Sequence, residues 1–447
     1  MEQNNRPLRI LVLTLAPWNY KNCTGSTQSS IFEGMENIEV ANIYCRYGEP
    51  DNTIVSRYFQ ITEKSMLNHL LKHAPSGYER KFDKTKQSET NIDVLNDGEN
   101  KLFNWMRILR FQIFYWAQEL FWKLNLWKSP ELTAFVKHFN PDIIWSPIYY
   151  TCYTNNLALY LKKITGKNLV CYISDDNYTM HQFSLSPFYW IDRLIKRPKI
   201  KKVIQSCSQL YVITEQQKNE YDKIFNISSK VLTKGATFKE QFPPVEVHNP
   251  IKLVFMGSLG FNRWKSLAKI AQALQQLSNN GISCFLSIYT MTPLTDKIKS
   301  KIEIDGVSKL QPTISNAQID PTFQDNDILI HVEPTDLKNT LYYRLSFSTK
   351  LVDYFRNGRC IIAYGGNTGS MKYLKDNDCG IVISPKDDLV KELATILSDT
   401  TLIEDYAHKS YEIGRKNHQI KIIQSNLKKN LEHFAKIITT RKTGGLN

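Results

Sequence analysis

The stretch "FSTKLVDYFRNGRCIIAYG" (Phe347 to Gly365) decides the fold of the second half of this chain. Ser348 is a favourable N-cap, and the residues from Thr349 to Arg356 predict about two turns of helix. Gly358 suits the end of that helix, and the apolar run after it predicts a buried strand. A short helix that leads directly into a buried strand is typical of a parallel sheet covered by helices.

The same alternation of apolar runs and helical patterns extends outward from this stretch, and it predicts an α/β protein with two doubly wound, Rossmann-like domains. A proline-containing polar stretch separates them, so we expect a first domain over residues 1–245 and a second over 246–405. We also expect a helical insertion near residues 60–130, and a C-terminal helical segment (406–447) that crosses back to the first domain. The predicted strands are residues 9–17, 142–148, 168–174 and 209–214, then 251–260, 283–290, 327–333, 360–366 and 380–384.

The bulk properties of the chain indicate a folded protein with an anionic partner. Its 447 residues are 42% hydrophobic, and the formal net charge of +14 favours nucleic acid, anionic lipid or a phosphate-bearing substrate. The eight scattered cysteines lack metal-site spacing, which predicts reduced thiols. Because neither a signal peptide nor a membrane-spanning run is visible, we expect a cytoplasmic protein.

Two places in the second half are suited to bind phosphate, because each follows a predicted strand. In "LVFMGSLGFNRWKSL" (Leu253 to Leu267), Gly257 and Ser258 lie at the strand end, and Arg263 and Lys265 precede a helix. An arginine fork suits a diphosphate because it donates two charge-assisted hydrogen bonds. The alternative is a turn with cations on the surface.

The second place is the helix predicted from Thr349 to Arg356. Its N-terminus carries Ser348, Thr349 and Lys350, and a helix N-terminus attracts anions. Asp353 lies one turn further on the same side, where it is suited to accept two hydrogen bonds from ribose hydroxyls. The alternative is a capped helix with a lysine and aspartate pair on its surface.

These motifs resemble the donor-binding domain of glycosyltransferases with the glycosyltransferase-B fold, especially family 4-like enzymes of bacterial capsule, exopolysaccharide and lipopolysaccharide assembly. In "GSLGFNR", Arg263 stands where those enzymes place a basic phosphate ligand, and "FSTKLVDYFRNGRCIIAYG" is similar to their "PTKLxEYLAxGxPVIA" segment. The resemblance spans most of residues 250–385, and more weakly the first half. There is one departure: Asp353 matches the second of two family glutamates, but Leu345 stands at the position of the first.

The first half carries a second set of candidate residues, in "CYISDDNYTMH" (Cys171 to His181). Adjacent side chains on a strand point to opposite faces, so we expect Asp175 and Asp176 to line a crevice rather than chelate one metal ion. The stretch resembles a "DD-W" turn on the acceptor side of related enzymes. His181 is then a candidate to bind the acceptor or the leaving diphosphate, and the alternative is a loop histidine without a role.

The loop after the first predicted strand contains Gly25, Ser26 and Thr27 ahead of a predicted helix. It resembles the first-strand loop of the same enzymes, which faces phosphate and acceptor. The alternative is an ordinary polar loop.

Two segments of the first half favour a membrane surface. Residues 101–128 are rich in aromatic and basic side chains, and "RLIKRPKIKK" (Arg193 to Lys202) is a basic cluster. Both compositions suit the interface of an anionic bilayer. A buried helical hairpin and a solvated charged face are the alternatives.

The resemblance implies a metal-independent, retaining glycosyltransferase without a cofactor, with a nucleotide sugar and a saccharide acceptor as its partners. The basic clusters favour a lipid-linked acceptor and a peripheral position on the inner face of the cell membrane. The alternatives are a nucleotide-sugar epimerase of the same fold and a nucleic-acid-binding protein, although the sequence contains no nucleic-acid-binding motif.

Overall fold

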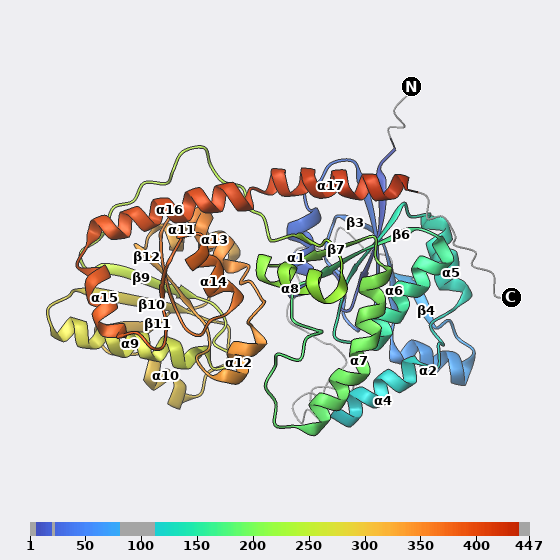
Figure 1. Ribbon diagram of the computed structural model, residues 1–447, viewed down its shortest axis with the longest axis horizontal. Helices are drawn as coiled ribbons and strands as arrows, with labels where there is room; N and C mark the ends of the chain where they lie inside the picture. Colours follow the sequence, from blue (N-terminus) through green and yellow to red (C-terminus); the bar gives the residue numbers. More distant parts are fainter. Residues whose placement is uncertain (1–5, 20–22, 81–111, 438–447) are drawn as a thin grey trace.

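The computed structural model describes residues 6–19, 23–80 and 112–437, which form two α/β domains side by side (Figure 1). Part of the aromatic and basic segment predicted at residues 101–128, namely 101–111, lies outside the described residues. In the described part of the chain, no helix has the length and apolar character needed to cross a bilayer. The seven cysteines whose side chains are described carry free thiols, as predicted.

The first domain contains an eight-stranded sheet in the order β4-β3-β2-β1-β5-β6-β7-β8, parallel except for the β3–β4 pair. Its central strands are continuous apolar runs because helices cover both faces. The strands are β1 (Leu8–Thr14), β2 (Ile38–Tyr44), β3 (Val55–Ile61), β4 (Gly77–Arg80), β5 (Ile143–Pro147), β6 (Asn168–Ile173), β7 (Gln209–Val212) and β8 (Lys230–Val231). The helices are α1 (Cys23–Phe32), α2 (Glu63–Lys72), α4 (Gln112–Trp122), α5 (Pro130–Phe139), α6 (Cys152–Thr165), α7 (Pro187–Ser206) and α8 (Glu215–Phe225).

The second domain contains a six-stranded, all-parallel sheet in the order β11-β10-β9-β12-β13-β14. Its strands are β9 (Ile251–Met256), β10 (Cys284–Tyr289), β11 (Ser308–Leu310), β12 (Ile328–Val332), β13 (Cys360–Tyr364) and β14 (Ile381–Ile383). Its helices are α9 (Arg263–Asn279), α10 (Asp296–Ile302), α11 (Asn316–Gln324), α12 (Leu337–Tyr342), α13 (Lys350–Asn357), α14 (Gly369–Asp376), α15 (Leu389–Leu397) and α16 (Thr400–His418). The α/β architecture with two parallel-sheet domains, predicted from the sequence, is confirmed.

The last described helix, α17 (Ile420–Lys436), belongs to the core of the first domain, although it follows the second domain in sequence (Figure 1). Leu427 and Leu431 are buried there beside strands β1 and β5. Gln424 donates hydrogen bonds to the carbonyls of Ile31 and Glu33. The first domain is therefore built from two parts of the chain that are far apart in sequence.

The two chain crossings between the domains are bonded to each other. The first is the linker after β8, and the second is the break between α16 and α17 at Gln419. Ala236 of the linker donates its N–H to the carbonyl of His418 at 2.9 Å and accepts from the N–H of Ile420 at 2.9 Å. Both crossings thus form one short, connected hinge.

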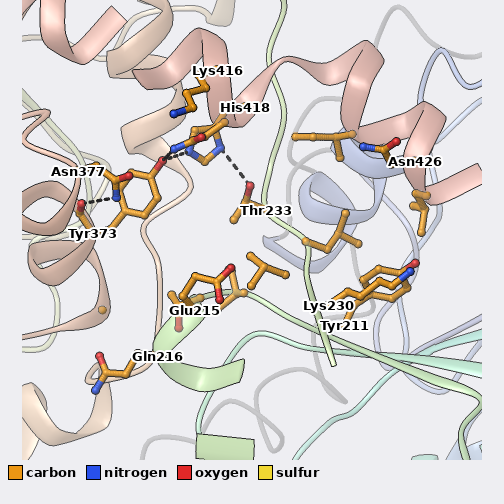
Figure 2. A pocket seen from close by; sticks show the side chains of 18 of the residues that line it. Tyr211, Glu215, Gln216, Lys230, Thr233, Tyr373, Asn377, Lys416, His418 and Asn426 are labelled. Carbon is orange, nitrogen blue, oxygen red and sulfur yellow. Dashed lines mark hydrogen bonds between the residues drawn. The ribbon is translucent and has the colours of Figure 1, made fainter. Parts of the chain in front are cut away.

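His418 anchors the hinge from the side of the second domain. Figure 2 shows its ring between Tyr373 and Thr233, and its two nitrogens lie 2.9 Å and 3.1 Å from their hydroxyl groups. Burial lowers the pKa of His418 to about 4, so the ring is neutral at physiological pH. A cavity of about 1070 Å³ opens beside it, lined by residues of both domains that include Lys230 and Tyr373.

Candidate functional site

A second cavity, of about 280 Å³, lies where the carboxyl ends of strands from both domains face each other. It is smaller than the cavity at the hinge, but it contains the residues suited to bind phosphate, and ligands of open α/β sheets bind at such strand ends. We therefore take this cavity as the candidate site. Of the residues predicted from the sequence, it is lined by Thr27, Asp175, Gly257, Ser258, Arg263, Ser348, Thr349 and Lys350.

Gly257 and Lys350 meet on the wall that the second domain contributes. A Cβ atom on Gly257 would lie 3.1 Å from the Nζ of Lys350, so a side chain at position 257 would crowd the ammonium group. Lys350 is the first residue of α13, and Thr349 is its N-cap rather than the predicted Ser348. The Ser348 N–H instead donates to the Ser370 hydroxyl at 2.8 Å. The one-residue offset leaves the cation at the helix N-terminus, next to the cavity.

Arg263 is held in place by Glu333, which follows β12. Its Nη2 and Nε lie 2.9 Å and 3.2 Å from the same oxygen of Glu333, and its guanidinium carbon lies 4.3 Å from the ring centroid of Tyr343. Burial raises the pKa of Glu333, but the hydrogen bond with His331 and the charge of Arg263 lower it below its ordinary value. Glu333 thus occupies the edge of the guanidinium formed by Nε and Nη2, and Nη1 is the nitrogen that makes no bond to it.

Asp353 and Lys265 do not line the cavity. Both carboxylate oxygens of Asp353 bond to the Nζ of Lys234 in the linker, at 2.7 Å and 2.8 Å. Lys265 is exposed on α9, with its Nζ 5.7 Å from the ring centroid of Trp264. In this structure the Asp353 carboxylate therefore pairs with the linker rather than lining the cavity, and its role toward the ribose stays a prediction.

Both Asp175 and Asp176 were predicted to line the crevice, but of the two only Asp175 lines the cavity. Asp175 lines the cavity and accepts a hydrogen bond from Ser346 of the second domain at 3.0 Å. Burial raises the pKa of Asp175. Asp176 is buried behind it, where burial raises its pKa but the bonds from Thr179 and the charge of Arg344 lower it overall. Among residues 6–19, 23–80 and 112–437, no group of three or more histidine, cysteine or carboxylate side chains is arranged to hold a metal ion.

His181 lies outside the cavity. Its side chain is 66% exposed, and its Nδ1 lies 3.1 Å from an oxygen of Glu220. Nothing in this arrangement brings the ring to the residues that line the cavity. The structure thus places His181 on the surface beside Glu220, and its predicted role toward the acceptor or the diphosphate stays a prediction.

Thr27 lies within α1 (Cys23–Phe32), rather than in a loop ahead of a helix as predicted, and it contributes to the cavity wall. A Cβ atom on Gly25 would overlap the backbone of Asn19, so glycine is required here by the close approach of two chain segments. The side chain of Ser26 lies outside the described residues. All three residues that were predicted to form this loop belong to α1, and Thr27 lines the cavity.

A short loop of the second domain, residues 344–346, is anchored in the first domain; we name it the docking loop. Arg344 bonds to Asp176 at 2.8 Å and to Glu220 at 2.7 Å. Leu345 is fully buried in the core of the first domain, and its carbonyl accepts from Thr214 at 3.0 Å. Family 4-like enzymes, which the sequence resembles, have a glutamate at this position. In this chain Leu345 instead packs its apolar side chain into the core of the first domain.

Several residues at or beside the cavity were not predicted from the sequence. Glu333, His331 and Tyr343 line the cavity, and Lys234 and Arg344 hold the carboxylates around it. The sequence did contain one signal for His331 and Glu333. In "DILIHVE" (Asp327 to Glu333), these two polar residues stand at the end of an apolar run. A charged group in a buried strand requires a partner, and that partner is Arg263.

Comparisons with known proteins identify the fold. No protein-family model and no curated protein sequence matches the chain. The structure is similar to sucrose-phosphate synthase from Thermosynechococcus elongatus, with a TM-score of 0.61 and 11% identity over 95% of this chain and 98% of that one. It is also similar to Anabaena HepE in complex with UDP (TM-score 0.59, 11% identity, 95% and 100% covered). A third similar structure is the pneumococcal O-GlcNAc transferase GtfA in complex with UDP and GlcNAc (TM-score 0.56, 13% identity, 96% and 100% covered). The chain therefore has the glycosyltransferase-B fold that the sequence predicted.

Proposed function

We propose that this protein is a glycosyltransferase that moves a sugar from a nucleoside diphosphate sugar to a saccharide acceptor in the cavity between its domains. The observation that carries the proposal is that Gly257, Arg263 and Lys350 line one cavity, with Lys350 at the N-terminus of α13. Two cations and a helix N-terminus suit a diphosphate. They act where negative charge develops as the diphosphate leaves, and stabilising that charge lowers the barrier to transfer.

The fold supports the same activity. The solved structures of HepE and of the pneumococcal transferase are described as complexes with UDP. Both are similar to this chain over nearly its whole length, but at identities that carry the fold alone. UDP is therefore the first nucleotide to test, and the residues around the cavity are the reason to expect binding.

Each side of the cavity has a distinct role in this proposal. Lys350 and Arg263, through Nη1, neutralise the diphosphate, and Glu333 fixes the plane of the arginine. Asp175 faces them from the first domain, on the side left for the acceptor. Because the two walls come from different domains, closure of the cleft excludes water and limits hydrolysis of the donor.

The finer assignment rests on the resemblance of the motifs around Gly257 and α13 to family 4-like enzymes. We propose on that basis that the acceptor is a growing bacterial glycan carried on a lipid. We further propose that the anomeric configuration is retained, and that transfer needs no metal ion because Arg263 and Lys350 supply the positive charge.

The deciding experiment incubates the purified protein with a panel of nucleotide sugars and bacterial membrane extract, with product masses as the readout. We expect one acceptor species to gain the mass of one sugar while the nucleoside diphosphate is released. The matched pair of variants is Arg263→Ala, which removes a cation from the cavity, and Lys265→Ala, which removes an exposed cation from the same helix. Release of an epimerised nucleotide sugar without an acceptor product would instead identify an epimerase.

A further inference from the structure

The N-terminal half of α7 has its polarity reversed relative to a helix on a water-exposed surface. Its inward face is charged, since Asp192, Arg193 and Lys196 are at most 6% exposed. Its outward face is apolar, and the exposed fractions are 57% for Phe188, 45% for Ile191, 55% for Leu194 and 48% for Ile195. An amphipathic helix in water turns its apolar stripe to the core. This half of α7 does the opposite.

The buried charges have partners that fix the helix in this orientation. Arg193 donates to the carbonyl of Asp176 at 2.9 Å and to that of Thr179. Lys196 pairs with Asp192 at 2.8 Å. Burying a charge is costly unless it is paired and hydrogen-bonded, and here both conditions are met. The interactions of the buried charges therefore hold α7 with its apolar side chains outward.

The exposed apolar surface continues onto the loop before α7 and onto α4. The Trp116 indole of α4 donates to Asp192 at 3.0 Å, and its ring centroid lies 6.0 Å from that of Phe188. Figure 1 shows α4 beside the N-terminal end of α7 at the lower edge of the first domain. We define the apolar face as the exposed side chains of Ile113, Phe114, Tyr115, Leu120, Leu124, Met180, Phe183, Leu185, Phe188, Ile191, Leu194 and Ile195.

Within the segments that carry the apolar face, residues 112–128 and 180–202, the exposed lysines are not matched by exposed carboxylates. The two acidic residues within 112–128 and 180–202 turn inward: Glu119 accepts from the N–H groups of Cys152 and Tyr153, and Asp192 is buried. The exposed cations of the same segments are Lys123, Lys128, Lys201 and Lys202. Three cations of the basic cluster predicted at Arg193 to Lys202 do not contribute, because Arg193, Lys196 and Arg197 bond to interior groups.

We propose that the apolar face inserts into the headgroup region of an anionic phospholipid bilayer, with the exposed lysines against the lipid phosphates. An apolar surface flanked by cations is the composition that binds such an interface. A second copy of the chain fits less well, because a two-fold contact through this face would bring the same lysines of both copies together.

The position of the face adds a functional consequence, which rests on the proposed transferase function. Arg193, on the inward side of α7, holds the loop that carries Asp176, next to the cavity wall at Asp175. The loop then runs directly into Met180 and Leu185, which are 38% and 87% exposed. A membrane-carried acceptor would thus reach the cavity from the bilayer along this loop.

The test is flotation of the full-length protein with vesicles of phosphatidylcholine, with and without phosphatidylglycerol. We expect binding that requires phosphatidylglycerol and weakens with salt, because salt screens the lysines. Phe188→Ser combined with Leu194→Ser should weaken the partition coefficient by about tenfold or more. Lys201→Gln combined with Lys202→Gln should remove most of the dependence on anionic lipid.

The matched controls carry the same changes elsewhere on the surface. Ile224→Ser with Ile422→Ser replaces apolar residues that are 43% and 56% exposed, and Lys386→Gln with Lys391→Gln replaces exposed lysines of the second domain. Both controls should bind vesicles as the wild type does. Equal vesicle binding by the α7 variants and the controls would overturn the proposal.

Two further outcomes would also overturn it. One is a wild type that ignores vesicles but forms a dimer that Phe188→Ser with Leu194→Ser disrupts, since the occupant is then a second copy. The other is a wild type that ignores vesicles and whose residues 81–111 cross-link to α7, since the occupant is then the chain itself. Calorimetry of UDP binding on the same samples tests the proposed transferase function separately. A protein that binds vesicles but not UDP would support the membrane proposal and contradict the transferase proposal.

Discussion

Arg263 lies at the first position of α9, with one edge of its guanidinium against a buried glutamate and one face over Tyr343. Burial lowers the pKa of Arg263, but the interactions with Glu333 and Tyr343 together raise it above its ordinary value, so the side chain remains charged. This geometry means that a substitution at Arg263 affects the folded state as well as the ligand. A useful test must separate the two effects.

Arg263→Ala is expected to weaken UDP binding, because a charge-assisted hydrogen bond contributes roughly 1.5–3 kcal/mol. Calorimetry measures the affinity, and Lys265→Ala provides the control cation outside the cavity. Since Arg263→Ala also leaves Glu333 buried without its partner, the double variant Arg263→Ala with Glu333→Gln should recover stability but not affinity. Unchanged UDP affinity in Arg263→Ala would remove this residue from the donor site.

Glu333 should make stability depend on pH. Because the pKa of its carboxyl lies below the ordinary value of 4.5 in the folded state, ionised Glu333 stabilises the fold above that value. The stabilisation is lost as pH falls through 4.5 toward the folded-state pKa. Urea denaturation of the wild type and Glu333→Gln should show a difference in unfolding free energy that shrinks between about pH 6 and pH 3. A difference that is constant with pH would contradict the assignment.

Chelation tests the assignment of the positive charge to side chains. If Arg263 and Lys350 neutralise the diphosphate, transfer should continue in the presence of EDTA. The rate of UDP release is the measurement, with an equal concentration of EDTA already saturated with calcium as the control. Loss of turnover that manganese or magnesium restores would assign the diphosphate to a metal ion instead.

The part of the site that could be predicted is the part with local signals. Gly257, Arg263 and Lys350 each follow a strand or open a helix, and sequence spacing shows that directly. Asp353 shows the limit of local signals. Its position one turn into α13 could be predicted, but its ion pair with Lys234 could not, because Lys234 is far from it in sequence. Pairs made across the fold, such as Arg263 with Glu333, could not be predicted from spacing.

The docking loop is a contact that the second domain makes with the first beside the candidate site. It joins α12 to α13, so the loop that reaches the first domain also leads into the helix that carries Lys350. Arg344 meets two carboxylates of the first domain, Asp176 and Glu220, and Ser346 meets Asp175. The position of α13 is thereby coupled to the first domain.

Leu345→Ala should destabilise the protein by about 2–5 kcal/mol, because it leaves a cavity in the first-domain core. Chemical denaturation measures the change, and Leu337→Ala, at a residue that is 60% exposed, is the control. Leu345→Met, which conserves volume, should retain both stability and activity. Leu345→Glu introduces the carboxylate that family 4-like enzymes have at this position. If this variant increased transfer, position 345 would be a sugar-binding position.

The α7 segment illustrates a limit of sequence reasoning at this scale. The run from Arg193 to Lys202 contains six cations, and a charge run ordinarily forms a solvated face. In the structure, Arg193, Lys196 and Arg197 bond to interior groups, while Lys201 and Lys202 face outward. Which side of a helix faces the core depends on what packs against it, here the carbonyls around Asp176. Composition alone cannot supply that information.

At the scale of the whole molecule, the doubly wound domains were predictable because buried parallel strands appear as continuous apolar runs. Strands β9 and β13 are examples of such runs, and both were predicted from them. Contacts between segments that are far apart in sequence were harder to predict. That α17 completes the first domain was an expectation drawn from its helical pattern, and its contacts with α1 and β6 became visible only in the fold.

The contribution of α17 to the first domain can be measured. Leu431→Ala should reduce the unfolding free energy by about 2–5 kcal/mol, because Leu431 is fully buried against that domain. Ile422→Ala, on the same helix at a residue that is 56% exposed, should change it little. Equal effects of the two substitutions would show that α17 rests on the domain without forming part of its core.

The discontinuous first domain has a consequence for biosynthesis. Domains usually fold one after another as the chain leaves the ribosome, with the N-terminal domain first. Here the strands of the first domain emerge early, yet the core around Leu427 and Leu431 is incomplete until α17 has been translated. The second domain, whose sheet and helices are contiguous in sequence, can complete its fold before the first one does. Nascent chains arrested ahead of α17 should therefore carry a protease-resistant second domain and a first domain that is still open to cleavage.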